Sequence, residues 1–232
     1  MRVVCIIQAR LGSQRLPRKI LADLGGHPLL WHVLNRATKI QGTAGTILAM
    51  PVEYEPGIVS DVAAEFGVPI VRPHVDEADL LGRYLIAANL ARADAVVRIT
   101  ADCPFLDPEV SGRVLGMFLT AGVEYAHNLA PESGYSEGLD TQVFTRHALY
   151  RAHQEATDPY DREHVCPWMG RHCLWLCVTN ADGDEGGRKW SVDTEPDLVH
   201  AQGIMAHLME GEFGWQRTLA AETQIGQLRL MG

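Results

Sequence analysis

The regular alternation of short apolar runs with longer amphipathic segments over the first 122 residues most constrains the fold. Residues 3–7 form a β-branched run, which is typical of a strand buried on both faces. Similar runs predict strands at residues 46–50, 68–71 and 95–100. Helical spacing of apolar residues predicts helices at 28–39, 57–66, 79–93 and 108–120. This alternation favours an α/β fold with a Rossmann-like, mostly parallel sheet and helices on both faces.

The pattern changes after residue 122. The elements expected there are a mixed-sheet strand at 139–144, helices at 147–155 and 162–171, a strand at 174–179, a brief strand at 190–192 and a helix at 195–208. The NADGDEGG stretch after residue 179 is predicted to be flexible. We interpret residues 127–180 as a small insertion on a continuous core, so that residues 1–232 form a single domain.

Length and charge argue against several classes of protein. The 232 residues, 47% of them hydrophobic, are enough for one α/β domain. A net charge of -9 argues against nucleic-acid binding. No run approaches the roughly 18 apolar residues of a membrane span, and the opening MRVVCII is too short for a secretion signal. Five cysteines without a disulfide framework predict reduced thiols and a cytoplasmic protein.

A cluster of cations follows the first predicted strand of this acidic chain. The stretch QARLGSQRLPRK contains Arg10, Arg15 and Lys19, together with Gly12 and Ser13. The loop after such a strand lies at the carboxyl edge of the sheet, where ligands usually bind. Glycine permits a close backbone approach, and the cations and hydroxyl suit phosphate oxygens. The stretch therefore predicts an anion site, with a solvated basic loop as the alternative. It contains neither a P-loop nor a G-x-G-x-x-G fingerprint.

The same stretch resembles the A-R-x-x-S-x-R-L-P-x-K motif of the sugar-acid cytidylyltransferases, which include the 3-deoxy-manno-octulosonate and acylneuraminate enzymes. The chain resembles most closely the spore-coat polysaccharide biosynthesis protein F branch. The resemblance implies a nucleotidyltransferase fold, similar to GT-A, with a small inserted subdomain for dimerisation and acceptor binding. It also implies that the loop wraps the triphosphate of CTP, using Ala9, Arg10, Gly12, Ser13, Arg15 and Lys19.

Two positions of this loop carry further expectations. Arg18 stands where these families usually have glycine, so it adds a cation and can stiffen the turn. Lys19 is expected to be exposed in the loop, so that its replacement weakens triphosphate binding with only small changes in stability. The resemblance implies that Arg15, Lys19 and Asp102 act in catalysis.

Two carboxylates are expected to share a Mg²⁺ ion. The segment RITADCPFLDPE resembles the G-D-x-P segment of these enzymes, which makes Asp102 a nucleotide-binding residue and a metal ligand. A carboxylate beside a triphosphate needs an intervening cation. The segment WSVDTEPDL resembles V-D-T-P-E-D-L, with Asp193 as the second ligand. The alternatives are caps: Asp193 could cap the following helix, a role that Thr194 could also take, and Asp107 suits a cap better than Asp102 does.

Three further segments resemble parts of the family's substrate sites. EADLLGRYLIAA places Arg83 near the nucleotide, with an exposed helix arginine as the alternative. EGLDTQVFT and DREHVCPWM resemble segments of the spore-coat branch, and they imply an acceptor site made of Asp140, Gln142, Arg162, Glu163 and His164. Gln142 replaces an acidic residue of that branch, so the charge preference for the acceptor can differ. Glu163 and His164 could instead form a pair on a helix surface.

A zinc site is an alternative for His164, Cys166, His172, Cys173 and Cys177. Their spacing fits no standard paired-cysteine ribbon, and a small core residue at position 166 is the favoured interpretation. The tryptophans at positions 168, 175 and 190 are interpreted as core or dimer contacts.

The resulting hypothesis is a transferase that moves CMP from CTP to a sugar acid or related acceptor and releases pyrophosphate. The resemblance places it in surface polysaccharide biosynthesis, as a cytoplasmic homodimer with Mg²⁺. One alternative is a glycosyltransferase with a nucleotide-sugar donor, although the usual D-x-D motif reads D-C-P here. Another is a nucleotide-binding protein without catalytic activity, which the retention of Asp102 and Asp193 disfavours. No local feature distinguishes cytosine from uracil.

Overall fold

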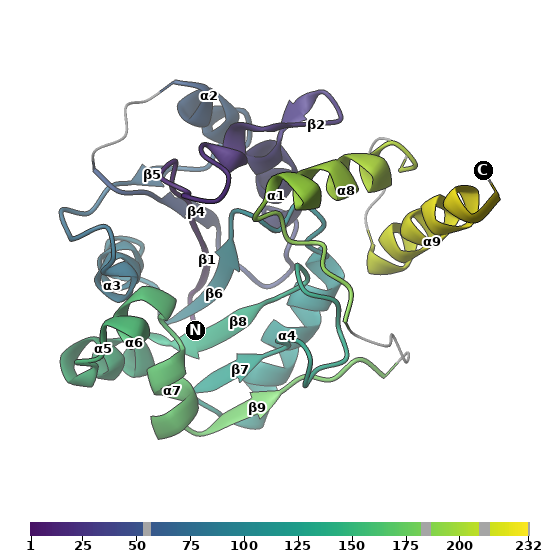
Figure 1. The fold of residues 1–232 in the computed structure, drawn as a ribbon. Helices are drawn as coiled ribbons and strands as arrows, with labels where there is room; N and C mark the ends of the chain where they lie inside the picture. Colours follow the sequence, from purple (N-terminus) through teal and green to yellow (C-terminus); the bar gives the residue numbers. More distant parts are fainter. Residues whose placement is uncertain (53–56, 182–186, 209–213, 232) are drawn as a thin grey trace.

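The computed structural model describes residues 1–52, 57–181, 187–208 and 214–231. Seven strands form one sheet in the order β5-β4-β1-β6-β8-β7-β9 (Figure 1). The strands of this sheet are β1 (Val3–Gln8), β4 (Thr46–Ala49), β5 (Ile70–Val71), β6 (Ala95–Thr100), β7 (Tyr125–His127), β8 (Gln142–Thr145) and β9 (Trp175–Cys177). Strands β5, β4, β1 and β6 are parallel to one another, as are β7 and β9, and β8 is antiparallel to both β6 and β7. The prediction of a mostly parallel α/β sheet is confirmed.

Helices cover both faces of the sheet (Figure 1). They are α1 (Leu29–Ala37), α2 (Ile58–Glu65), α3 (Leu80–Leu90), α4 (Pro108–Ala121), α5 (Arg146–Glu155), α6 (Pro159–His164), α7 (Pro167–His172), α8 (Glu195–Met205) and α9 (Trp215–Met231). Each strand alternates its side chains between two apolar clusters, because successive residues point to opposite faces. On β1, Cys5 and Ile7 pack with α1, α2, α4 and α8. Val4 and Ile6 pack with α3, α5 and α7.

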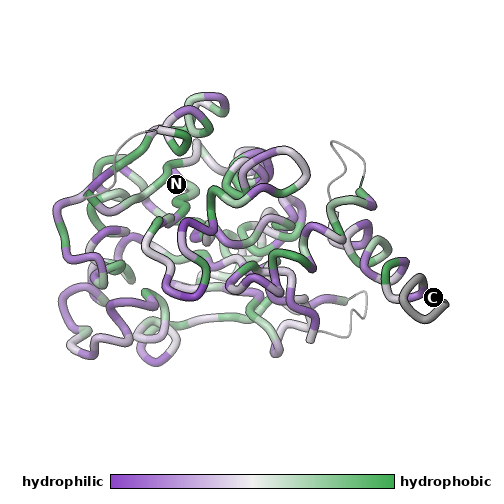
Figure 2. The backbone as a smooth tube through the Cα atoms, turned by 45° about the horizontal axis from the view of Figure 1, so that its top comes forward, coloured by the Kyte–Doolittle hydropathy of each residue, from purple (hydrophilic) through white to green (hydrophobic). Residues whose placement is uncertain are grey.

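Figure 2 shows hydrophobic and hydrophilic residues alternating along the chain around this core. The C-terminal helix α9 packs beside α8, with Trp215 and Ala221 buried in the larger cluster. Among the described residues, no helix is both long and apolar enough to cross a membrane.

The structure differs from the predicted elements at three places. The helix expected at 162–171 is two short helices, α6 and α7, because Val165 between them has a φ of 72° and Pro167 begins the second. The strand expected at 190–192 is absent from the described elements, and the pairing there is an isolated bridge between Glu137 and Lys189. Residues 182–186 of the stretch that was predicted to be flexible lie outside the described residues.

The sequence analysis also missed a small hairpin, formed by β2 (Asp23–Leu24) and β3 (His27–Pro28). Its turn consists of Gly25 and Gly26, both with positive φ. The segment interpreted as an insertion, residues 127–180, supplies β8, β9 and α5 to α7. Its strands extend the same sheet as β1 and β6.

Candidate functional site

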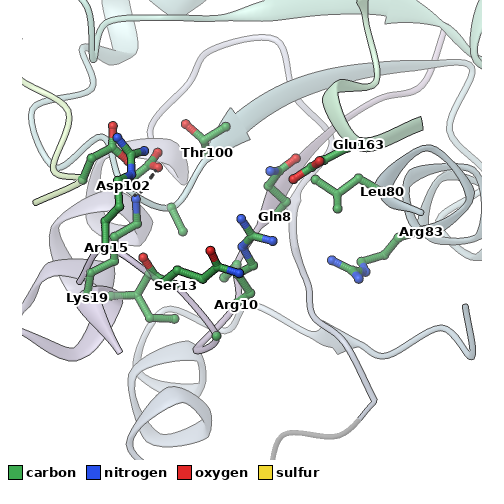
Figure 3. Close-up of a pocket in the computed structure, with 16 residues that line it drawn as sticks. Gln8, Arg10, Ser13, Arg15, Lys19, Leu80, Arg83, Thr100, Asp102 and Glu163 are labelled. Atoms are coloured by element: carbon green, nitrogen blue, oxygen red, sulfur yellow. Dashed lines mark hydrogen bonds and ion pairs between the residues drawn. The ribbon is translucent and has the colours of Figure 1, made fainter. Parts of the chain in front are cut away.

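A cavity of about 470 Å³ opens at the carboxyl ends of β1 and β6 (Figure 3). All eight residues that were predicted to bind the nucleotide line it: Ala9, Arg10, Gly12, Ser13, Arg15, Lys19, Arg83 and Asp102. Asp193 lines it as well, and so does Glu163 from α6. The chain therefore brings together residues that lie up to 185 positions apart, from Gln8 to Asp193, at the edge where a parallel sheet usually binds its ligand.

The loop after β1 folds back on itself before it enters the short 3-10 helix η1 (Lys19–Leu21). The Arg18 N–H donates to the carbonyl oxygen of Leu11 at 3.1 Å. Arg18 takes up a left-handed conformation, with a φ of 57°. Glycine adopts this conformation without strain and most other residues do not. The residue at which the chain departs from the family motif therefore occupies a position that suits glycine.

Lys19 holds the two predicted metal ligands together. Its Nζ atom lies 2.8 Å from Asp102 Oδ2 and 2.8 Å from Asp193 Oδ1. Those two carboxylate oxygens are therefore separated by at most twice 2.8 Å. Arg15 and Lys189 also pair with Asp193, at 3.0 Å and 3.3 Å.

The expectation that Lys19 is an exposed loop residue is wrong. Its side chain is only 12% exposed, because the ammonium group points inward to both carboxylates. Burial opposes the charged form, but the two carboxylates outweigh it and raise the pKa of Lys19. Burial would likewise raise the pKa of Asp193, and the hydrogen bonds and charges of Lys19 and Lys189 lower it. Both shifts favour the charged forms of Lys19 and Asp193 near neutral pH.

The backbone around residue 192 brings Asp193 to this position. The Val192 N–H donates to the Asp102 carbonyl oxygen at 2.8 Å, which fixes the two segments side by side. Thr194, not Asp193, caps α8: its hydroxyl accepts from the backbone N–H of Asp197, whose carboxylate bonds back to the Thr194 N–H. Likewise, Asp107 caps α4. Neither Asp102 nor Asp193 is therefore needed as a helix cap.

Arg83 lies across the cavity from Lys19 and Asp102 (Figure 3). It is 1% exposed, so it is not the exposed helix arginine of the alternative interpretation. Its guanidinium donates to the Glu77 carbonyl oxygen at 3.0 Å, and its Nε has no hydrogen-bond partner. Burial lowers the pKa of Arg83. With Arg10, it gives the side of the cavity away from the carboxylates a positive charge.

A second cavity, also of about 470 Å³, lies on the α6 side of the sheet. The residues that line it include Arg98, Tyr125, His127, Glu132, Gln142, Tyr160, His164 and Trp175. Two of the predicted acceptor residues, Gln142 and His164, lie here, whereas Glu163 lines the first cavity.

The backbone at the end of α6 explains how the neighbours Glu163 and His164 line different cavities. Val165 has φ 72° and ψ -55°, and the Cys166 N–H donates to the His164 carbonyl oxygen at 2.8 Å. This is a γ-turn, a strained conformation for a β-branched residue. The strain lies next to Glu163 and His164, where residues of both cavities meet.

The remaining predicted acceptor residues line neither cavity. Arg162 pairs with Asp79 at 2.9 Å and donates to two backbone carbonyl oxygens, so it joins α6 to the start of α3. Asp140 accepts from the Gly138 N–H at 3.0 Å, and burial raises the pKa of its carboxyl group. A side chain at Gly138 would collide with the backbone of Trp190 and Ser191, so this turn requires glycine.

The zinc alternative receives little support from the geometry. Among the described residues, the group that could hold a metal is His127, Glu132 and Cys177. Of the five residues in the zinc alternative above, this group contains only Cys177. The Leu129 N–H donates to His127 Nδ1, so this nitrogen is unprotonated and the proton is on Nε2. For Nε2 to bind a metal, it would have to lose this proton, and Nδ1 would have to gain one and give up its hydrogen bond from Leu129. Cys166 is 3% exposed and packs in the core, as the sequence predicted.

Several residues that line these cavities, and one cation beside them, were not predicted from the sequence. Lys189, which pairs with Asp193, could have been found from its position four residues before that carboxylate. Arg98 is the one charged residue of the otherwise uncharged strand AVVRIT. Gln8 and Thr100 end β1 and β6, the two strands that meet at the first cavity.

Comparison with known proteins agrees with the site. The family model described as cytidylyltransferase matches residues 4–229. A 3-deoxy-manno-octulosonate cytidylyltransferase of Nitratidesulfovibrio vulgaris is 33% identical over 212 residues, which cover 88% of this chain and 72% of the relative. A solved cytidylyltransferase from Leptospira borgpetersenii has 25% identity and a TM-score of 0.90, with 98% and 96% of the two chains covered.

A structure of CMP:2-keto-3-deoxy-manno-octonic acid synthetase complexed with CTP shares the fold, with a TM-score of 0.67, 18% identity, and coverage of 89% of this chain and 99% of that one. The match over nearly the whole chain and the relative at 33% identity lead to one conclusion. The chain belongs to the sugar-acid cytidylyltransferase family and is an enzyme of that type.

Proposed function

We propose that the protein transfers CMP from CTP to a sugar acid and releases pyrophosphate. The observation that carries this proposal is the cluster in which Lys19 of the phosphate loop holds both Asp102 and Asp193. Basic groups that suit a triphosphate and carboxylates that suit a hard cation meet there in one cavity. Nucleotidyl transfer from a nucleoside triphosphate requires this combination.

In the reaction, a hydroxyl oxygen of the acceptor forms a bond to the α-phosphorus of CTP. The bond from that phosphorus to the oxygen bridging to the β-phosphate breaks, and pyrophosphate leaves with the electron pair. The hydroxyl proton passes to water. Negative charge accumulates on the leaving group, where the guanidinium of Arg15 and the ammonium of Lys19 would stabilise it. Arg10 and Arg83, at the other side, would hold and orient the nucleotide.

Mg²⁺ is the cofactor that we propose, and the residues present fit it. The proposal is supported by Asp102 and Asp193, which offer hard oxygen donors and already share one positive group, the Lys19 ammonium. Mg²⁺ typically takes one or two protein carboxylates together with phosphate oxygens and waters. When bound, it would neutralise phosphate charge and lower the pKa of the acceptor hydroxyl.

The acceptor would lie between the two cavities, near Glu163, His164 and Gln142. Asp140 and Arg162 would position this region without contacting the acceptor. Asp140 fixes the turn at Gly138, and Arg162 holds α6 through its ion pair with Asp79. The sugar-acid preference is supported by relatives named as cytidylyltransferases for 3-deoxy-manno-octulosonate and for 8-amino-3,8-dideoxy-manno-octulosonate.

We further propose a homodimer in the cytoplasm that serves surface polysaccharide synthesis. The support for a dimer is the edge strand β9, where Leu174 and Trp175 are 64% and 43% exposed. Unpaired edge strands with apolar side chains invite pairing with another chain. Sedimentation of the wild type and of Leu174→Asp tests this proposal: the wild type should be a dimer and the variant should dissociate.

The function is tested by the products formed from CTP, Mg²⁺ and a panel of sugar acids. Release of pyrophosphate together with a CMP conjugate of the acid supports the proposal. A glycosyltransferase would release a nucleotide from a preformed donor instead, and an inactive binding protein would release nothing. Asp102→Asn is the matched variant, because it preserves side-chain shape while removing the charge.

A further inference from the structure

A row of polar side chains crosses the sheet next to the nucleotide cavity. The strand registers pair Arg98 of β6 with Gln142 of β8, Gln142 with His127 of β7, and His127 with Cys177 of β9. Residues paired across neighbouring strands project from the same face of a sheet. Three of the four, Arg98, Gln142 and His127, line the second cavity.

Arg98 carries a charge that no carboxylate of the described residues contacts directly, and Asp102 acts on it only from a distance. Its guanidinium donates to the amide oxygen of Gln142 and, at 3.1 Å, to the amide oxygen of Gln8. Its Nε is buried without a hydrogen-bond partner. In the described parts of the chain, no aspartate or glutamate forms an ion pair with Arg98. Glu132 also lines the cavity, and it lies beside His127 and Cys177 at the other end of the row.

Gln142, one of the two neutral partners of Arg98, is held in place by a further hydrogen bond. The amide nitrogen of Gln142 donates to the Tyr125 hydroxyl at 2.7 Å, which orients the amide oxygen toward Arg98. The guanidinium also lies 5.8 Å from the centre of the Tyr84 ring. A positive charge is thus held in place in the wall of a cavity. A partly buried charge without a counter-ion is costly, and an anion bound in the cavity would offset that cost.

The position of Arg98 joins the two cavities. Arg98 donates hydrogen bonds to two glutamines: Gln8, which lines the nucleotide cavity, and Gln142, which lines the second cavity. An anionic group of a small molecule bound to Arg98 would therefore lie next to the nucleotide.

We propose that the second cavity is an anion subsite in which Arg98 binds the carboxylate of the acceptor. The subsite requires a neutral residue at position 142, because an acid there would form an internal ion pair with Arg98. The proposal rests on the proposed function for the identity of the acceptor as a sugar acid. Arg98 and Gln142 are its specificity-determining pair.

The test measures binding, not turnover. The full-length protein is saturated with CMP, and its affinity for 3-deoxy-manno-octulosonate and for the uncharged methyl ester of that acid is measured by calorimetry. We expect the wild type to bind the acid on the order of 100-fold more tightly than the ester, a factor in keeping with one charge-assisted, bidentate pair. Arg98→Gln and Gln142→Glu should both lose this preference.

Gln154→Glu is the matched control, since it makes the same chemical change at an exposed position of α5. It should retain the preference for the acid. Thermal unfolding shows whether the variants fold. The Tm also reports whether the Arg98 charge lacks a counter-ion in the wild type. Gln142→Glu gives Arg98 a counter-ion, and the Tyr125 hydroxyl can donate to the new carboxylate. Its Tm should therefore rise by about 2–4 °C, whereas the Tm of the control should stay unchanged.

Three results overturn the proposal: a wild type that binds the acid no better than the ester, a preference retained in Arg98→Gln, or a Tm of Gln142→Glu at or below that of the wild type. Failure of the proposed function would look different. In that case, no pyrophosphate would be released from CTP, while the Arg98-dependent preference for the acid would persist in the CMP-loaded protein.

Discussion

Replacing Lys19 by methionine should destabilise the protein, because it leaves two carboxylates facing each other without their shared cation. Methionine keeps the length of the side chain and removes only the charge and the hydrogen bonds. In the wild type, the Lys19 ammonium lies 2.8 Å from both Asp102 and Asp193. All three side chains are less than a third exposed, so solvent screens their charges only in part.

The expected magnitude follows from these distances. Two unit charges at about 5.6 Å repel by about 3 kcal/mol at an effective dielectric constant of about 20. Arg15 and Lys189 remain beside Asp193 and offset part of this repulsion, but weakly, because both are more exposed. We therefore expect the free energy of unfolding to fall by about 1–3 kcal/mol near pH 7.

The effect should depend on pH in a defined way. The pKa of Asp193 is lowered below its ordinary value of 3.8, so the stability from its ion pairs is present above pH 3.8 and is lost as pH falls through the lower value of the folded protein. The pKa of Lys19 is raised above 10.5, so its contribution is present below pH 10.5 and is lost as pH rises through the higher value of the folded protein. The difference between wild type and variant should be largest between these limits.

The assay is urea unfolding of the wild type, Lys19→Met and the surface control Lys39→Met at pH 3, 7 and 9. The control should stay within about 0.5 kcal/mol of the wild type. A Lys19→Met protein as stable as the wild type at pH 7 would refute the reasoning. So would a destabilisation that is as large at pH 3 as at pH 7.

Three other sets of variants test separate parts of the account. Asp102→Asn and Asp193→Asn should each lower kcat on the order of 10²-fold, about 3 kcal/mol, and the double variant should be little worse than either one; fully additive losses would contradict a shared cation. Arg18→Gly should raise the free energy of unfolding by up to about 1 kcal/mol, because glycine removes the strain of the left-handed conformation, and a loss of more than 1 kcal/mol in urea unfolding would speak against that conformation. Thr194→Ala should cost about 1 kcal/mol of stability through the lost cap, and calorimetry should find its affinity for CTP unchanged.

The sequence predicted best what depends on local periodicity. Strands β1, β4, β5 and β6 and the helices between them follow from apolar spacing that can be seen in short windows. The break between α6 and α7 did not, because Val165 is a residue that local propensity keeps out of the left-handed region. Its conformation is set by tertiary packing, since the side chain is fully buried in the second cluster.

The composition of the first cavity could be predicted, but the pairing within it could not. The motif around Lys19 and the carboxylates Asp102 and Asp193 were each visible in the sequence. The burial of Lys19 depends on partners 83 and 174 positions away, so no local pattern reports it. The same holds for Arg162, whose partner Asp79 is 83 positions distant.

For Arg98, a local sequence signal was present but was not used. A charged residue within the strand AVVRIT was a signal that could have been used, because a charge in a buried strand needs a reason. What it contacts could be known only from the registers of β6, β8 and β7.

The most direct test of the central claim is to incubate the protein with CTP, Mg²⁺ and 3-deoxy-manno-octulosonate and to measure pyrophosphate and the CMP conjugate of the acid together. The account predicts equal amounts of both products from the wild type, and on the order of 10²-fold slower formation of both with Asp102→Asn. Pyrophosphate without the conjugate, or equal rates from wild type and Asp102→Asn, would contradict it.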